Sequence, residues 1–443
     1  MNDALRKEMA ALLTERQDRL RKACSVKGTG ERTDALILLC REVLRSSSLR
    51  LVDGEPHCFD GRCYAPVSIS EAGAVLMNAL VDMGVPPTDV RRMGDMPLSV
   101  IGERSSASGR LLCFTNGILE LGGADRGSWK FTPGFSPEAI ATEKIPYAYN
   151  PSAMCTKWEA FLAEVLPDEG QRTVLQEFIG LVYADRSRLS VEKFAIFVGK
   201  GANGKSVIFE VLRRVLGKDN VSTLDTAQLT SERMVPYVKG KRLNFSPDVR
   251  KSAEFDSALK ALASGQDVTG RRIYGDAELV SCPPLIFALN EMPRFRDTSD
   301  AFFRRILLFS FGVQIPPEKQ DRRLVEKICE HDTPGIFNWV MEGCARLIRN
   351  GGEFSPCDRM DQDLFSLRLD ADSESHPVRA YLERRGFTLS PRYPGQQYTL
   401  VSQNEIALAL GGAVSRTMIT IELRRAGVAT HRSRELFYKV YEK

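Results

Sequence analysis

The sequence has no uninterrupted apolar run of about 18 residues, the length that a membrane-spanning helix needs. Its first residues, MNDALRKEMAALLTERQDRLRK, are charged from the start and contain no signal-peptide core. We therefore expect no membrane partner, and the sequence predicts a cytoplasmic protein.

Paired cysteines and a strong charge imbalance are also missing. The ten cysteines occur singly, with no C-x-x-C pair, so we expect them to behave as small hydrophobic residues. The 61 basic and 57 acidic residues give a net charge of +4, which is too weak to imply nucleic acid. The excess is local, because eleven Lys/Arg against five Asp/Glu give residues 378–443 a net charge of +6.

The strongest motif is a glycine-rich turn between an apolar run, KFAIFVG, and a predicted helix, VIFEVLRRVLG. Residues 199–206, GKGANGKS, match the phosphate-binding pattern G-x-x-x-x-G-K-S. Glycines let backbone N–H groups converge on phosphate oxygens, and the helix N-terminus adds a positive dipole. Lys205 is placed to neutralise β- and γ-phosphate charge, and the Ser206 hydroxyl suits Mg²⁺. The residues predicted to bind ATP with Mg²⁺ are Gly199, Gly201, Ala202, Asn203, Gly204, Lys205 and Ser206.

Two further apolar runs end in polar residues. Asp248 follows the predicted strand LNF and is the candidate acid for Mg²⁺ and its bound water, with a turn aspartate as the alternative. Asn290 ends PPLIFALN and is a candidate contact for the γ-phosphate or the attacking water, with a turn-capping role as the alternative. Glu254 and Asp256 are predicted to lie on a helix, EFDSALKALA.

Arg304 and Arg305 precede another apolar run, ILLFSF. An arginine inserted into a neighbouring subunit's nucleotide site would stabilise charge on the transferring phosphoryl group. The alternative is a salt-bridged pair at the edge of a strand.

In this order the motifs resemble the superfamily 3 helicases, above all the phage- and plasmid-type primase C-terminal helicases related to the poxvirus primase-helicase. GKGANGKS, LKALASGQDVTGRRIYG, LIFALNEMP and RRILLFSF carry the resemblance, which covers about residues 110–355. It implies that Asn290 is sensor 1 and that Arg305 is the arginine finger, with Arg304 as second choice. Asp248 stands where relatives commonly have Glu.

The resemblance also implies a homohexameric ring with DNA in its central channel. TGRRIYG, residues 269–275, would form a channel hairpin in which Arg271 and Arg272 bind phosphate and Tyr274 stacks on a base. The alternative is an ordinary basic turn. Lys260 is a further candidate for DNA contact, unless it faces solvent on its helix.

The predicted fold is an α/β P-loop, AAA+-like ATPase core at 146–355 that begins with a helical collar. A mixed α+β lead-in region precedes it at 1–145, starting with two helices broken at Gly28 and Gly30. An acidic linker at 356–376 leads to a C-terminal winged helix at 377–443, whose second helix would enter a DNA major groove. The basic residues predicted to bind DNA there are Arg416, Arg424, Arg432 and Arg434. Binding to protein is the alternative use of such a domain.

These observations predict an ATP-dependent DNA helicase that acts on single-stranded or forked DNA during replication of a mobile genetic element, phage or plasmid. A separate primase or another replication protein is the expected partner. Two alternatives remain open: an ATP-switched origin-binding or helicase-loading protein with little unwinding of its own, and a P-loop ATPase that acts on protein.

Overall fold

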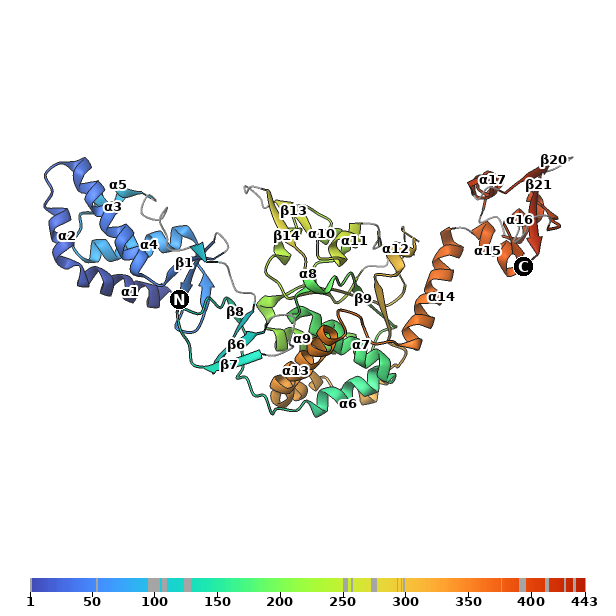
Figure 1. Ribbon diagram of the computed structural model, residues 1–443, viewed down its shortest axis with the longest axis horizontal. Coiled ribbons are helices and arrows are strands. Elements are labelled where there is room, and N and C mark those ends of the chain that lie inside the picture. The colour runs from blue at the N-terminus through green and yellow to red at the C-terminus, as the bar shows by residue number, and fades with distance from the viewer. Residues whose placement is uncertain are drawn as a thin grey trace.

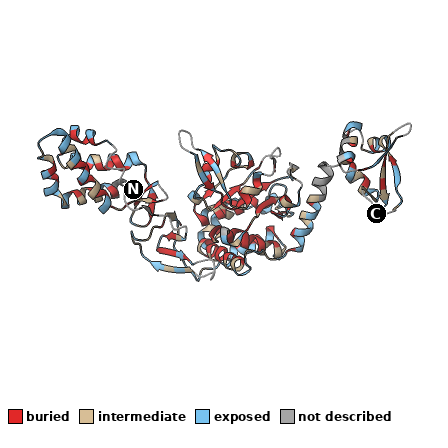
Figure 2. Cartoon of the chain, turned by 45° about the horizontal axis from the view of Figure 1, so that its top comes forward, coloured by how far each residue is buried: buried red, intermediate tan, exposed pale blue. Residues whose placement is uncertain are grey.

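The computed structural model arranges the chain as an N-terminal helical region, a central body and a small C-terminal lobe (Figure 1). Buried residues gather in each of these parts (Figure 2). The structure describes residues 2–52, 55–94, 104–105, 110–122, 129–249, 254–255, 258–271, 277–292, 294–295, 297, 299–375, 377–389, 396–410, 414–425, 428–432 and 436–442.

The predicted helical start is present, but the described residues 2–52 contain three helices and not two. Gly28 precedes the third helix with a φ of 109°, whereas Gly30 lies inside that helix, so the predicted break at Gly30 is wrong. The first break falls at Arg16 instead. The helices are α1 (Asn2–Glu15), α2 (Gln17–Cys24) and α3 (Thr29–Ser46).

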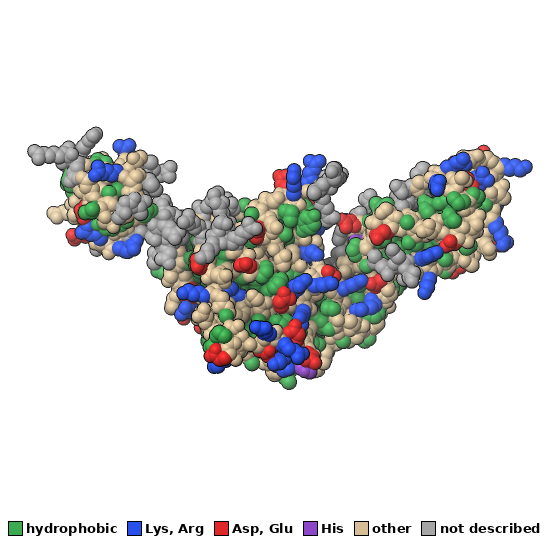
Figure 3. Space-filling view, turned by 180° about the vertical axis from the view of Figure 1, so that it is seen from behind, with side chains coloured by type: hydrophobic (Ala, Val, Ile, Leu, Met, Phe, Trp, Pro, Cys, Tyr) green, Lys and Arg blue, Asp and Glu red, His purple; other side chains and the backbone are tan. Residues whose placement is uncertain are grey.

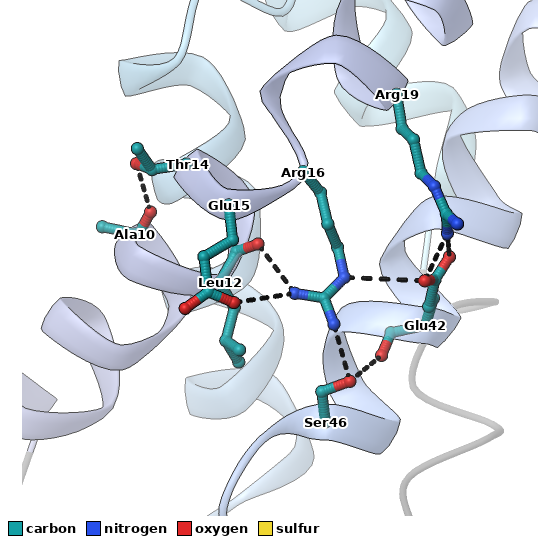
Figure 4. A network of polar contacts seen from close by, with 8 residues as sticks. All are labelled: Ala10, Leu12, Thr14, Glu15, Arg16, Arg19, Glu42 and Ser46. Carbon is teal, nitrogen blue, oxygen red and sulfur yellow. Dashed lines mark hydrogen bonds and ion pairs between the residues drawn. The ribbon is translucent and has the colours of Figure 1, made fainter.

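Arg16 ties these three helices together (Figure 4). Its guanidinium donates to the Leu12 carbonyl of α1 at 3.1 Å and to the Ser46 hydroxyl of α3 at 2.9 Å. Its Nε lies 3.7 Å from the Glu42 carboxylate, which also pairs with Arg19 of α2. One side chain at the break therefore satisfies groups from both sides of it.

Two small sheets and two more helices follow. A capping box formed by Ser68 and Glu71 fixes the start of α4. The sheet orders are β3-β2-β1-β4 and β7-β6-β5-β8. The elements are β1 (Leu49–Val52), β2 (Glu55–Phe59), β3 (Tyr64–Pro66), α4 (Ile69–Asp82), α5 (Pro87–Met93), β4 (Arg104–Ser105), β5 (Leu111–Phe114), β6 (Gly117–Leu121), β7 (Trp129–Pro133) and β8 (Glu143–Lys144).

The central body is built on a parallel sheet with the order β10-β11-β15-β9-β17. Its strands are short apolar runs, and all five residues of β15 are buried, as parallel strands covered on both faces require. The strands are β9 (Phe194–Val198), β10 (Val221–Ser222), β11 (Leu243–Ser246), β15 (Leu285–Leu289) and β17 (Ile306–Ser310). Around them lie α6 (Thr156–Val165), α7 (Glu169–Gly180), η2 (Leu181–Tyr183), α8 (Arg186–Leu189), α9 (Lys205–Leu216), η3 (Lys218–Asn220), α10 (Thr226–Leu229), η4 (Val235–Val238), α11 (Ala258–Ala263), α12 (Asp300–Phe303), η5 (Pro317–Lys319) and α13 (Leu324–Arg349).

Helices α7 and α13 touch through their backbones. A Cβ at Gly180 of α7 would meet the backbone of Cys344, and a Cβ at Gly343 of α13 would meet the backbone of Gln176. Two glycines facing each other's helix therefore set the distance between α7 and α13.

The structure contradicts one local prediction and adds a helix to another segment. Glu254 lies not on a helix but on β12 (Glu254–Phe255), which pairs with β16 (Arg294–Phe295). The segment predicted as an acidic linker contains α14 (Asp358–Ser375). Its apolar residues at positions 360, 364 and 367 lie on one helix face and pack against the core.

The C-terminal lobe contains three helices and a small antiparallel sheet in its described residues. Ser402 accepts a hydrogen bond from the Glu405 amide and caps the start of α16. Strand β21 lies between β19 on one side and β18 with β20 on the other. The elements are α15 (Pro377–Arg384), β18 (Phe387–Thr388), β19 (Thr399–Ser402), α16 (Gln403–Ala409), α17 (Arg416–Arg425), β20 (Thr430–Arg432) and β21 (Leu436–Glu442).

All ten cysteines are free, and eight of them are buried, as expected of small apolar residues. In the part of the chain that the structure describes, no helix is both long and apolar enough to cross a membrane. Seen from behind, basic side chains lie beside acidic ones over the central body (Figure 3), in keeping with the nearly balanced composition.

Candidate functional site

The glycine-rich loop connects β9 to α9 in the way a phosphate-binding loop requires. Gly204 has a φ of 87° directly before the first residue of α9, a backbone conformation that suits glycine. At Gly199 a Cβ would meet the Phe311 carbonyl oxygen and the Asn203 amide, so only glycine fits. Ala202 also has a positive φ, of 61°. The loop therefore curls at the N-terminus of α9, where backbone amides and the helix dipole attract anions.

Lys205 is the first residue of α9 and folds back over the loop. Its Nζ donates to the Gly199 carbonyl at 2.5 Å and to Asn203 Oδ1 at 3.0 Å. The residue is buried, and burial lowers the pKa of its ammonium group. Ser206 follows on the exposed side of the helix. The structure thus brings the seven predicted loop residues together in one turn.

Asp248 and Asn290 lie at the same edge of the sheet as the loop. Since β11, β15 and β9 are adjacent and parallel, their carboxyl ends meet there. Both residues are exposed, and the Val249 amide donates to the Ala288 carbonyl at 3.0 Å, which ties the end of β11 to β15. Asp248 also lines a cavity of 510 Å³ together with Phe209 of α9.

Arg304 and Arg305 lie at the opposite edge of the sheet, just before β17. The Phe194 amide donates to the Arg305 carbonyl at 2.9 Å, which places both arginines beside the start of β9. Five residues of strand separate them from the loop of the same chain, a span of about 16 Å. They are therefore too far from the loop to contact a phosphate bound there in the same chain.

Glu192 forms ion pairs with both arginines. Within one chain the two residues are therefore a salt-bridged pair at the edge of a strand, which was the alternative to an arginine finger. Arg305 is held firmly: its side chain is 11% exposed, its Nη2 lies 2.6 Å from Glu192, and its Nη1 donates to the Ala301 carbonyl. Arg304 is 65% exposed and lies 3.5 Å from the same carboxylate. Exposure therefore favours Arg304 as the residue that reaches outward, whereas the sequence resemblance favours Arg305.

The same edge holds two charged residues that sequence reasoning missed, Glu192 and Lys193. Lys193 Nζ donates to the Arg304 carbonyl at 2.6 Å, and burial lowers the pKa of this lysine, although Glu353 and Asp361 oppose the shift. Together with Arg304 they line a cavity of 550 Å³. The only sequence signal was a Glu-Lys pair directly before the apolar strand.

The predicted hairpin is present as β13 (Asp267–Arg271) and β14 (Ala277–Ser281). Gly270 lies against Pro236, and Arg271 is on the exposed face. The predicted DNA contacts Arg272 and Tyr274 lie outside the described residues. Lys260 Nζ forms an ion pair with the Asp297 carboxylate at 2.5 Å. Burial alone would raise the pKa of Asp297, but hydrogen bonds from Lys260 and Ser299 hold this pKa below its usual value. Lys260 would have to leave that pair to bind DNA.

The basic residues predicted in the C-terminal lobe are only partly described. Arg416 begins α17 and Arg424 lies near its end, and both are exposed. Arg432 lies on β20, with its side chain outside the described residues, and Arg434 lies outside them altogether. The structure thus places two of the four on one helix.

Two family models match the chain. One, described as "D5 N terminal like", matches residues 90–167, and the other, "Family of unknown function (DUF5906)", matches residues 197–305. The second match runs from the strand before the phosphate loop to Arg305. The predicted relationship to primase-type superfamily 3 helicases is confirmed by these matches together with the relatives below.

Two viral proteins are similar to parts of the chain. "Putative helicase L207/L206" of Acanthamoeba polyphaga mimivirus is 27% identical over 161 residues, which are 34% of this chain and 16% of that protein. "Putative helicase 121R" of Invertebrate iridescent virus 3 is 26% identical over 208 residues, which are 42% of this chain and 22% of that protein. The matched segments thus make up less than a quarter of either relative.

A solved structure has a related fold. The apo structure of the NrS-1 C terminal region aligns over 92% of this chain and 99% of its own, with a TM-score of 0.50 and 11% sequence identity. At that identity the likeness concerns the fold alone.

Proposed function

We propose that this chain, a relative of the D5-type primase-helicases of superfamily 3, is an ATP-dependent DNA helicase that serves replication of a mobile genetic element, phage or plasmid. One observation carries the proposal. The parallel order β11-β15-β9-β17 sets the phosphate loop, Asp248 and Asn290 at one edge of the sheet, and the arginine pair at the other. This arrangement is expected when ATP is bound between neighbouring AAA+ subunits of a ring, because one subunit then supplies the phosphate loop and the other supplies the arginine.

The residues of the loop fit ATP with Mg²⁺. The loop has no room for side chains at Gly199, and α9 presents its N-terminus, Lys205 and Ser206 to the same place. When bound, the metal ion neutralises phosphate charge and positions the attacking water. Lys205 would hold the β- and γ-phosphates, Ser206 and Asp248 would hold the ion, and Asn290 would orient the water or contact the γ-phosphate.

An arginine from the adjacent subunit would complete the site. In this proposal the subunits form a homohexamer, and each presents Arg304 or Arg305 to its neighbour's nucleotide. Departure of the phosphate would then change the contact between subunits, which is how hydrolysis in a ring drives movement along DNA.

The DNA contacts would come from two places. Hairpin β13–β14 would line the central channel, with Arg271 on its exposed face. The lobe at 377–443 runs α15, β19, α16, α17, β20 and β21, with β21 between β19 and β20, an order that supports a winged helix. Its α17 would present Arg416 and Arg424 to duplex DNA. With it we retain a lead-in region at 1–145 and an ATPase core at 146–355.

The test is unwinding of a forked duplex by the full chain with ATP and Mg²⁺. We expect strand separation by the wild type and none by Lys205→Ala. Lys241→Ala removes a half-buried lysine whose Nζ donates to the Asp219 carbonyl, and this control is expected to unwind normally. Absence of unwinding by the wild type would contradict the proposal, as would normal unwinding by Lys205→Ala.

A second candidate is an ATP-switched origin-binding or helicase-loading protein with little unwinding of its own. A single exposed acid at Asp248 and the basic C-terminal segment favour it. Steady-state hydrolysis separates the two, because a translocating helicase is strongly stimulated by single-stranded DNA, whereas a switch hydrolyses ATP slowly with or without it.

A further inference from the structure

Asn203 uses both ends of its side-chain amide inside the phosphate loop. The residue is 3% exposed. Its Oδ1 accepts a hydrogen bond from Lys205 Nζ at 3.0 Å, and its Nδ2 donates to the Phe311 carbonyl at 3.4 Å. A buried amide with partners at both ends is held in one orientation. Asn203 therefore joins the phosphate-binding lysine to the segment that follows β17.

Lys205 has too few donors to keep its present bonds and also bind a triphosphate. An ammonium group has three N–H donors. Two of them already bond the Gly199 carbonyl and Asn203. Contact with both a β- and a γ-phosphate oxygen needs two donors, and only one remains. At least one present bond has to open, and the bond to Asn203, at 3.0 Å against 2.5 Å, is the longer.

The segment after β17 is bonded to the loop region at two further points. The Phe311 amide donates to the Val198 carbonyl at 2.7 Å, and the Ile315 amide donates to the Ala202 carbonyl at 2.8 Å. Because these bonds keep the segment in place, the Asn203 amide stays anchored through Nδ2 while its oxygen exchanges partners. The side chain can therefore release Lys205 without the loop losing its shape.

We propose that Asn203 is a positioning residue that restrains Lys205 in the empty loop and gives up that bond when a nucleoside triphosphate binds. This deepens the proposed function and rests on it, because Lys205 has to contact phosphate. The consequence is regulatory: the strength of one buried hydrogen bond sets how much ATP is needed to fill the site.

The experiment measures the dissociation constant of ATP by calorimetry on full-length variants. Asn203→Asp has a similar shape and loses the donor to the Phe311 carbonyl, but its charge strengthens the bond to the ammonium group, so ATP binding should weaken about tenfold. Asn203→Ala removes the restraint, and ATP should bind as tightly as to the wild type or more tightly. The negative charge of the Asp variant also repels phosphate, so weaker ATP binding by this variant has two possible causes. The result for Asn203→Ala therefore decides whether the inference holds.

A matched control lies at the other end of α9. Asn220 Nδ2 bonds the Leu216 carbonyl at 2.7 Å, far from the loop, and Asn220→Asp should leave the dissociation constant within about twofold. If Asn203→Ala unfolds too readily to be measured, Asn203→Ser replaces it in the experiment. The serine side chain is too short to reach Lys205, so this variant should also bind ATP as tightly as the wild type or more tightly.

Weaker ATP binding by Asn203→Ala or Asn203→Ser, at an unchanged melting temperature, would overturn the inference, because the amide would then contact the nucleotide directly. A dissociation constant is independent of the active fraction, so partial unfolding of a variant would not by itself change it. Failure of the proposed function would give a different result. The wild type itself would bind no ATP, or Lys205→Ala would bind ATP as well as the wild type does.

Discussion

The two edges of the central sheet differ although the same strands connect them. At the carboxyl edge, Asp248, Asn290 and Ser206 are exposed around a loop shaped for phosphate. At the amino edge, two arginines share a single glutamate, Glu192. The first edge is shaped for phosphate, and the second holds cations about 16 Å from the phosphate loop of the same chain. In the function proposed above, the two edges are half-sites, and a second chain completes each of them.

The largest effect should come from removing the exposed arginine. We expect Arg304→Ala to lower ATP hydrolysis about 1,000-fold, since an arginine finger contributes on that scale. The measurement is a mixing experiment: Arg304→Ala subunits keep a working loop, and Lys205→Ala subunits keep working arginines. Mixed rings should regain activity that neither variant has alone. No recovery on mixing would contradict a site shared between subunits, and recovery with Arg305→Ala in its place would identify Arg305 as the finger.

The next effect should come from the carboxyl edge. Asp248→Asn should lower hydrolysis about 100-fold while ATP binding persists, because the amide holds the metal ion and its water poorly. Hydrolysis and calorimetric binding are measured in parallel. Asp219→Asn, on an exposed turn, serves as the control. Normal hydrolysis by Asp248→Asn would assign the metal to a different acid.

A smaller effect is expected from Glu192→Gln at the amino edge. This change removes the negative charge that the two arginines share but keeps both arginines, and the pair with the exposed Arg304 is worth little. Hydrolysis should change by less than about tenfold. A loss as large as that of Arg304→Ala would mean that Glu192 positions the arginine during turnover. The amino edge would then contain a carboxylate needed for hydrolysis, as the carboxyl edge does with Asp248.

The smallest effect should come from pH. Burial lowers the pKa of Lys205 below the usual 10.5, so on raising the pH this lysine loses its charge before an exposed lysine does. Bound phosphate favours the charged form, so ATP binding is strongest at neutral pH and should weaken as the solution becomes alkaline. ATP dissociation constants measured from neutral to alkaline pH check this. Affinity that stays constant until ordinary lysines titrate would contradict it.

Much of the carboxyl edge could be predicted from the sequence because its chemistry is local. The loop occupies eight consecutive residues, and Asp248 and Asn290 each follow an apolar run that reads as a buried strand. The amino edge could be predicted only in part. The pairing of Arg305 with Glu192 joins residues 113 positions apart, and no pattern marks such a contact.

The errors in the fold have the same origin. β12 forms only because β16 pairs with it, so EFDSALKALA looks helical throughout when it is considered alone. In α14 the few apolar residues were hidden among acidic ones, yet they suffice to dock the helix on the core. The lobe's α15, β18 and β19 were missed because each is short and depends on β21 or α17 for its packing.

The backbone contact between α7 and α13 has a consequence for the history of this protein. Gly180 and Gly343 have no side chain with which to bind or catalyse, yet any side chain at either position would force the two helices apart. Selection should therefore preserve these glycines as strictly as Lys205. In an alignment of related sequences, we expect these two glycines to be as invariant as the residues that bind ATP. Invariance alone would therefore not separate positions needed for helix packing from positions needed for catalysis.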